Sequence, residues 1–179
     1  IDFISFDLPT FSASFDKWQS KAAASAVDYA AHMNLTRFDD RVAQELPGLP
    51  RLGISSIKTF TAYNGRLRID DGSIFKALRI ARENGMLVLL HAENGDVIEV
   101  LVNEALQLGH WEPIWHARTR PAWGAVDAAM RAFALAASAD APIYLVHMNV
   151  AGEVDMLEYA RSHGIQAMGE TCPHYLFFT

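Results

Sequence analysis

The chain has 179 residues, of which 51% are hydrophobic and 20% are charged, and its formal net charge is −6. This length is that of one domain, which can bury a substantial core. The negative charge and the scattered Lys and Arg residues argue against a nucleic-acid partner. No apolar run reaches the ~18 residues of a membrane span, so we expect no membrane association. The single cysteine, Cys172, excludes an internal disulfide and fits a reducing, cytoplasmic location.

Short aliphatic or β-branched runs alternate along the chain with longer stretches of helical period. These runs predict strands at residues 1–7, 28–33, 55–60, 86–91, 142–147 and 165–169. Several of them are almost continuously apolar, which is typical of parallel strands that are covered on both faces.

The segments between these strands predict helices with recognisable ends. Asp70 or Asp71 is placed to cap one helix, and Gly85 is placed to end it. Further helices are predicted at residues 15–26, 40–46, 96–108, 126–137 and 153–163. The segment 110–123 is rich in Pro, Trp and Arg, and we expect it to form an ordered loop between two helices.

This alternation of strands and helices predicts an α/β fold with parallel strands. A doubly wound sheet and a TIM-like (β/α)8 barrel both have this pattern. No glycine-rich phosphate loop follows any strand, which disfavours a nucleotide-binding sheet. A complete barrel usually needs roughly 250 residues, and both ends of the chain interrupt apolar runs. We therefore expect one partial barrel domain, residues 1–179, with about six of eight βα units and truncated at both ends.

Three of the predicted strands carry, at or near their carboxyl ends, a residue that can bind a metal or act as a nucleophile. These residues are Lys58, His91 and His147. In a parallel barrel the carboxyl ends of all strands open on the same face, where such folds place their active sites. We therefore expect the three side chains to surround one pocket.

Each of these residues also has a structural interpretation. A histidine after an apolar strand can be a hydrogen-bonded core residue, and Lys58 could lie at the strand rim against Asp70 or Glu93. Burying an unpaired ammonium group is costly, so a buried lysine would indicate a function. A lysine with a lowered pKa can act as a base, form a Schiff base, or react with carbon dioxide to give a carbamate. The carbamate is an anion whose two oxygens can bridge two metal ions.

Five segments carry a more specific signal. They are GISSIKTFTAY at 53–63, LVLLHAENGDVI at 87–98, HARTRP at 116–121, IYLVHMN at 143–149 and GETCPHYL at 169–176. In this order they resemble the dihydropyrimidinase and hydantoinase branch of the amidohydrolases. The resemblance extends through essentially the whole chain, including DYAAHM at 28–33, and it implies the central part of an amidohydrolase barrel domain.

The resemblance implies that carbon dioxide carboxylates Lys58 and that the carbamate bridges two divalent metal ions, usually zinc. It also implies that His91 and His147 bind the second ion and that Tyr63 hydrogen-bonds the substrate carbonyl oxygen. A packed loop aromatic is the structural alternative for Tyr63. The implied substrate is a small cyclic ureide or imide such as a dihydropyrimidine or hydantoin, and the implied product is an N-carbamoyl amino acid. The implied assembly is a homo-oligomer, which is a tetramer in the family.

The chain also departs from the family pattern. No His-x-His pair for the first ion precedes Ile1, and no metal-binding Asp follows the last strand, so we expect this chain to be inactive by itself. Allantoinases and dihydroorotases share the metal arrangement, and some dihydropyrimidinase-like proteins are scaffolds that have lost their metal ligands. Retention of Lys58, His91 and His147 argues against a scaffold, while Tyr63 and ENGD at 93–96 favour a dihydropyrimidinase.

Several other polar or aromatic residues have structural interpretations. We expect His32 to lie in the core or beside the metal ligands, and Glu93 and Asn94 to shape the loop after His91 or to support that histidine. We expect Cys172 to be a packed thiol. The other residues are interpreted as loop histidines (His110, His116, His163 and His174) or as a satellite cluster or oligomer contact (Trp111, Trp115 and Trp123).

Overall fold

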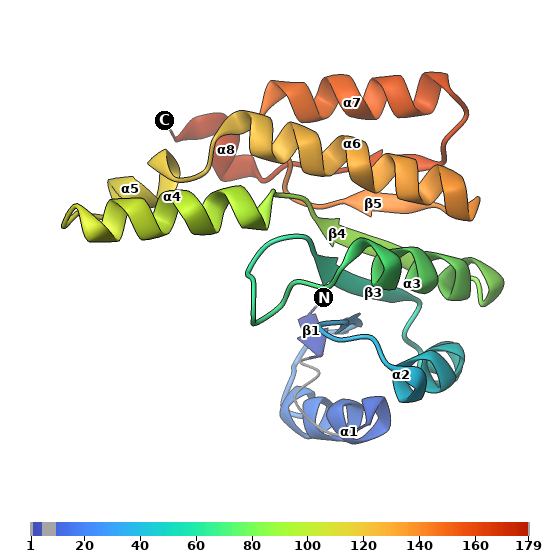
Figure 1. Ribbon diagram of the computed structural model, residues 1–179. Helices are drawn as coiled ribbons and strands as arrows, with labels where there is room; N and C mark the ends of the chain where they lie inside the picture. Colours follow the sequence, from blue (N-terminus) through green and yellow to red (C-terminus); the bar gives the residue numbers. More distant parts are fainter. Residues whose placement is uncertain (1, 5–9, 179) are drawn as a thin grey trace.

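Six parallel strands form one sheet in the computed structural model, which describes residues 2–4 and 10–178 (Figure 1). The order of the strands in the sheet is their order in the chain. A sequential parallel order is that of a (β/α) barrel, whereas a doubly wound sheet reverses its strand order. The strands are β1 (Asp2–Ile4), β2 (Ala31–Asn34), β3 (Ser56–Phe60), β4 (Leu87–His91), β5 (Ile143–Leu145) and β6 (Ala167–Gly169).

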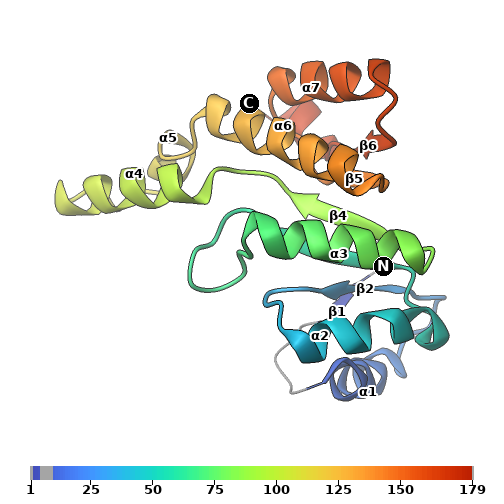
Figure 2. The ribbon, with the colours of Figure 1, turned by 45° about the vertical axis from the view of Figure 1, so that its right-hand side comes forward.

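Helices connect successive strands (Figures 1 and 2). The first three connections contain α1 (Phe11–Ala22), then α2 (Asp40–Glu45) with the 3-10 helix η1 (Leu46–Leu52), and then α3 (Asp71–Glu83). The later part of the chain contains α4 (Gly95–Gln107), α5 (Ile114–Arg118), α6 (Ala122–Ala139), α7 (Ala151–Ser162) and α8 (Pro173–Phe177). In both views α4 and α5 extend away from the sheet. Within the described residues, no helix is both long and apolar enough to cross a membrane.

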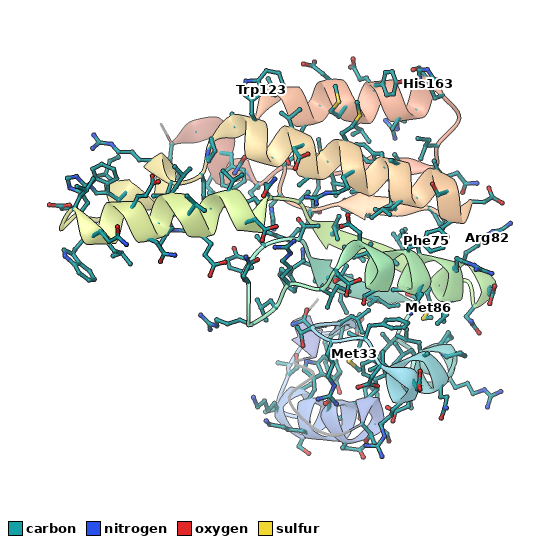
Figure 3. All side chains as sticks on the ribbon, in the orientation of Figure 1. Met33, Phe75, Arg82, Met86, Trp123 and His163 are labelled. Atoms are coloured by element: carbon teal, nitrogen blue, oxygen red, sulfur yellow. The ribbon has the colours of Figure 1, made fainter. Side chains whose placement is uncertain are left out.

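The hydrophobic core lies between one face of the sheet and the helices. Side chains alternate between the two faces along a strand, so every second strand residue points into this core. α6 packs between α3 and α7 through small side chains, which allow close approach of the helices. The fully buried strand residues of the core include Met33 (labelled in Figure 3), Ile57, Val88, Leu90, Ile143 and Leu145. The residues between them face the opposite side of the sheet.

The strand predictions are confirmed in number and order, with differences at the ends. β2 begins at Ala31 rather than at Asp28. β5 ends at Leu145, so His147 follows the strand instead of ending it, and its φ of 46° turns the chain there. Of the strand predicted at 1–7, residues 1 and 5–7 lie outside the described residues.

The helix predictions differ more. α1 begins at Phe11 because Thr10 caps it, with the Thr10 hydroxyl oxygen accepting the Ala13 N–H at 3.1 Å. The segment 110–123 was predicted as a loop, but it contains α5 and the first two residues of α6. Its prolines precede these helices, where a missing backbone N–H costs nothing.

Asp70 caps α3, as the sequence predicted. Its carboxylate accepts hydrogen bonds from the Ser73 backbone N–H at 2.9 Å and from the Ser73 hydroxyl at 2.8 Å. The side-chain bond, followed by the backbone bond, lowers the pKa of Asp70 from its ordinary value of 3.8.

We expect Asp70→Ala to lower the free energy of unfolding by about 1 kcal/mol at neutral pH, because the first turn of α3 loses its cap. A lowered folded-state pKa stabilises the fold above the ordinary Asp pKa, and this stabilisation is lost as the pH falls through the folded-state value. The difference between the two proteins should therefore shrink in acid. Chemical denaturation at neutral and acidic pH measures it. Asp70→Asn should retain most of the cap, and equal losses for Asn and Ala would contradict the capping role.

Candidate active site

A cavity of about 920 Å³ opens on the face of the sheet that the core does not occupy. The four residues singled out from the sequence, Lys58, Tyr63, His91 and His147, all line it. The predicted convergence of Lys58, His91 and His147 on one pocket is therefore observed. Other lining residues come from the cavity-facing strand positions, from the adjoining loops and from the start of α7, and they include His32, Asn34, Ser56, Phe60, Leu89, Glu93, Arg120, Tyr144, Glu153 and Glu170.

Lys58 is a buried lysine inside this cavity. The residue is 3% exposed, and its Nζ has no hydrogen-bond partner among the described residues. The Nζ lies 4.7 Å from the centroid of the Phe60 ring. Burial lowers the pKa of Lys58 to about 7, against the opposing charge of Glu170. The alternative of a rim lysine paired with Asp70 or Glu93 is therefore wrong.

His91 and His147 face each other across the ends of β4 and β5. His91 Nδ1 and His147 Nε2 are 3.1 Å apart. Two imidazole nitrogens that bind one tetrahedral zinc ion at about 2.0–2.1 Å lie roughly 3.3 Å apart, so this spacing fits a shared ion. Burial, reinforced by the positive charges of His91 and Lys58, lowers the pKa of His147 to about 4. His147 is therefore neutral at neutral pH, which a metal ligand requires.

The position of His147 is held by hydrogen bonds on both sides of it. The Val146 N–H donates to the Leu90 carbonyl at 3.2 Å, and the Met148 N–H donates to the Glu170 carbonyl at 2.7 Å. The chain thus remains attached to β4 and to the residue that follows β6 while it turns at His147.

The side chains that line the cavity fit the implied metal ions only if Lys58 is carboxylated. Among the described residues, no cluster of three or more His, Cys, Asp or Glu side chains is arranged as a metal site. A protonated Lys58 would repel a cation, whereas its carbamate would add anionic oxygens next to the two imidazoles. The unpartnered Nζ and its lowered pKa fit that modification, because carbon dioxide reacts with the neutral amine.

Tyr63 lies on the loop between β3 and α3. Its ring packs on His91 and Phe60, with centroid separations of 5.0 and 6.0 Å. Its φ is 68°, in the left-handed region that few residues other than glycine adopt. Burial and the charge of Glu93 raise the pKa of Tyr63, although Arg120 opposes this, so the hydroxyl remains a donor at neutral pH.

Comparisons with known proteins agree on one group of enzymes. The D-hydantoinase of Geobacillus stearothermophilus is 42% identical over 165 residues, which is 91% of this chain and 35% of that protein. A solved D-hydantoinase structure has a TM-score of 0.96 at 40% identity and covers 99% of this chain and 39% of its own. A dihydropyrimidinase structure from Brevibacillus agri NCHU1002 has a TM-score of 0.95 at 40% identity, covering 98% of this chain and 39% of its own. No family model matches the chain.

The chain is a homologue of the D-hydantoinases and dihydropyrimidinases. It spans about a third of the length of the curated relatives it matches. The resemblance stated from the sequence is thereby confirmed, and so is the partial α/β barrel with parallel strands.

Sequence reasoning missed several cavity residues of this hydantoinase homologue. His116 was interpreted as a loop histidine, but it lies in α5 and lines the cavity. Glu153 is buried at the start of α7, where its carboxylate accepts the N–H groups of Asn149 and Val150 at 2.8 and 3.1 Å. A Glu at the third position of a helix was a usable signal for such a bond to the preceding backbone. Arg120 was missed because its segment was predicted to be a loop.

Two structural interpretations have different outcomes. His32 lies beside the predicted ligands, as expected, and its Nδ1 is hydrogen-bonded to the Ser56 hydroxyl. Within the described part of the chain the three tryptophans do not form one buried cluster, while their alternative interpretation as an oligomer contact stays a prediction. Trp115 stacks on His110, whereas Trp111 and Trp123 are exposed, the latter at the start of α6 (Figure 3).

The loop that carries Tyr63 is attached to the start of α4. The Glu93 N–H donates to the Thr61 hydroxyl oxygen at 3.0 Å, and Arg68 forms an ion pair with Asp96. Gly95 lies directly beneath this loop. A Cβ at Gly95 would lie 2.9 Å from the Thr61 carbonyl oxygen and 2.9 Å from the Ala62 Cα.

We expect Gly95→Ala to lower the free energy of unfolding by about 1–3 kcal/mol, because backbone atoms on both sides must move apart. Gly124→Ala in α6 is the matched control, since its nearest neighbours would lie 3.7 Å from the new Cβ. That change should be neutral or slightly stabilising, because alanine favours the helix. Denaturant titration of both variants measures the difference, and equal stabilities would contradict the close approach at Gly95.

Proposed function

We propose that this protein is a metal-dependent hydrolase of cyclic amides, which opens the ring of a dihydropyrimidine or hydantoin to give an N-carbamoyl amino acid. The observation that carries the proposal is the buried, unpartnered Lys58 amine in the same cavity as the facing His91 and His147. Similarity to D-hydantoinases and a dihydropyrimidinase supports the same reaction class.

Lys58, His91 and His147 are the residues that would hold two divalent metal ions, with zinc the expected element. The neutral Nζ of Lys58 attacks carbon dioxide, a C–N bond forms and one proton is released, so the side chain becomes an anion. Its two oxygens and the two neutral imidazoles then form a ligand set of the kind that zinc accepts. When bound, the metal ions would polarise the substrate carbonyl and lower the pKa of a water molecule.

Tyr63 would bind the substrate carbonyl oxygen. Negative charge grows on this oxygen as the ring amide is attacked, and a hydroxyl donor stabilises it most in the transition state. The turn after Tyr63 is closed by the N–H groups of Arg66 and Leu67, which donate to the Tyr63 carbonyl at 3.1 and 3.0 Å. These bonds fix the backbone at Tyr63, and its ring packs on His91 and Phe60.

The domain assignment and the assembly state remain predictions. We propose that residues 1–179 form the central part of one amidohydrolase barrel domain, a proposal supported by six consecutive parallel strands. We also propose a homo-oligomer, because exposed apolar residues such as Trp111, Ile114 and Trp123 offer a surface that a second copy could bury.

Replacing Lys58 tests the proposed function in the full-length protein. We expect Lys58→Ala to abolish hydrolysis of hydantoin and dihydrouracil, because the anionic bridge is lost. A short carboxylic acid should partly restore this variant, whereas Lys58→Arg should not respond, because its guanidinium stays cationic and fills the space. In protein equilibrated with zinc and carbon-13 bicarbonate, NMR should detect a carbamate signal that both variants lack.

Near-normal turnover by Lys58→Ala with both metals bound would contradict the carbamate role. Parallel assays with allantoin and dihydroorotate separate the related ring-opening activities, since faster hydrolysis of either would move the substrate class away from hydantoins.

Tyr63→Phe tests the role of the hydroxyl. We expect kcat to fall by about 10²–10³-fold with a small change in KM, as for loss of one donor to a developing oxyanion. Metal content should be unchanged, because Tyr63 is not among the proposed ligands. A raised KM with an unchanged kcat would show that Tyr63 only binds the substrate.

A further inference from the structure

The Glu93 carboxylate lies between His91 and Arg120. Its Oε2 accepts a hydrogen bond from His91 Nε2 at 2.5 Å, and its Oε1 lies 3.7 Å from Arg120 Nε in an ion pair. The side chains of His91, Glu93 and Arg120 are 10%, 15% and 21% exposed. At this degree of burial water screens their interactions only partly.

The backbone on both sides of Glu93 is fixed from two directions. On one side the Glu93 N–H donates to the Thr61 hydroxyl at 3.0 Å, and on the other the Asn94 N–H donates to the Gly124 carbonyl at 3.0 Å. The second bond attaches the start of α6 to this turn, only four residues after Arg120. Arg120 itself donates from Nη1 to the His116 carbonyl at 2.9 Å.

These contacts determine which nitrogen of His91 carries the proton. The Glu93 carboxylate lies between the permanently charged Arg120 guanidinium at Oε1 and His91 Nε2 at Oε2, so it acts as a carboxylate anion toward both. A carboxylate only accepts, so His91 Nε2 must donate. In the neutral ring Nδ1 then carries the lone pair, and Nδ1 is the atom that faces His147.

We propose that Glu93 and Arg120 are positioning residues, which fix the tautomer and ring orientation of His91 and so prepare its Nδ1 as a ligand. The inference rests on the proposed function in one respect only, namely that the species bound by Nδ1 of His91 is a divalent metal ion. It gives the HARTRP segment, which lies some thirty residues away in sequence, a role at the site. Arg120 acts through Glu93 by fixing the carboxylate from the side opposite to His91.

Four variants and a control separate these roles. Glu93→Gln keeps the shape but allows an amide to donate to His91, and Arg120→Met removes the charge but keeps the stem. Arg120→Lys restores the charge, and the Glu93→Gln/Arg120→Met double variant tests whether Arg120 acts through Glu93. Arg118→Met is the matched control, because Arg118 lies on the same segment but stacks over Trp115, 4.9 Å from the ring centroid.

The first measurement needs no metal. Nitrogen-15 NMR of the histidine rings in metal-free, full-length protein should show His91 as the Nε2–H tautomer. We expect Glu93→Gln to lose this preference, Arg120→Met to weaken it, and Arg120→Lys to restore most of it. Arg118→Met should leave it unchanged. An unchanged tautomer in Glu93→Gln would overturn the proposal, and an unchanged tautomer in Arg120→Met would overturn the part played by Arg120.

The second measurement is zinc affinity by competition with a chelator. Glu93→Gln should weaken binding by about 10–100-fold and Arg120→Met by about tenfold, as is typical for partners of a ligand histidine. The double variant should match Glu93→Gln alone, because Arg120 acts through Glu93, and additive losses would overturn that route. If wild-type protein binds no zinc, the proposed function fails, while the tautomer measurement still decides the positioning role.

Discussion

The alternation of side chains along buried parallel strands is the constraint on which the rest of the structure depends. Successive residues of β3 point to opposite faces, so Ile57 enters the core while Lys58 enters the cavity. The register pairs Lys58 with Leu89 and Phe60 with His91, which places the lysine and the histidine on the same face of adjacent strands. Packing of the core fixes the backbone of β3. This backbone places the Lys58 side chain where it is buried, and the burial lowers its pKa.

The reactive side chains also depend on how the strand ends are joined to one another. The turn after β4 contacts the loop after β3 through Thr61 and contacts the start of α6 through Gly124. Glu153 closes the turn after His147 from within α7. The contacts of Thr61 and Gly124 thus join parts of the cavity rim that are distant in the sequence, whereas Glu153 closes its turn locally, within four residues.

Much of the fold and part of the site could be predicted from the sequence. The apolar runs indicated six strands, and Lys58 and His91 were found because they interrupt or end such runs. The orientation of His147 could not be predicted, because it depends on backbone hydrogen bonds that its neighbours in the chain make to Leu90 on β4 and to Glu170 just after β6. Arg120 was missed for a similar reason, since its ion pair with Glu93 forms only when a short helix within a proline-rich segment brings the two together.

The left-handed backbone at Tyr63 and His147 has a consequence for how the site opens. Such conformations are strained in residues with a side chain and persist only where surrounding bonds enforce them. Around Tyr63 these bonds lie in an exposed or half-buried turn, whereas the bonds beside His147 are made by the buried residues Val146 and Met148. Opening of the Tyr63 turn therefore requires less free energy than opening of the sheet, so the amide hydrogens of Arg66 and Leu67 should exchange by local fluctuation. The loop that carries Tyr63 can thus open and close again while the strands and the backbone at His147 stay in place.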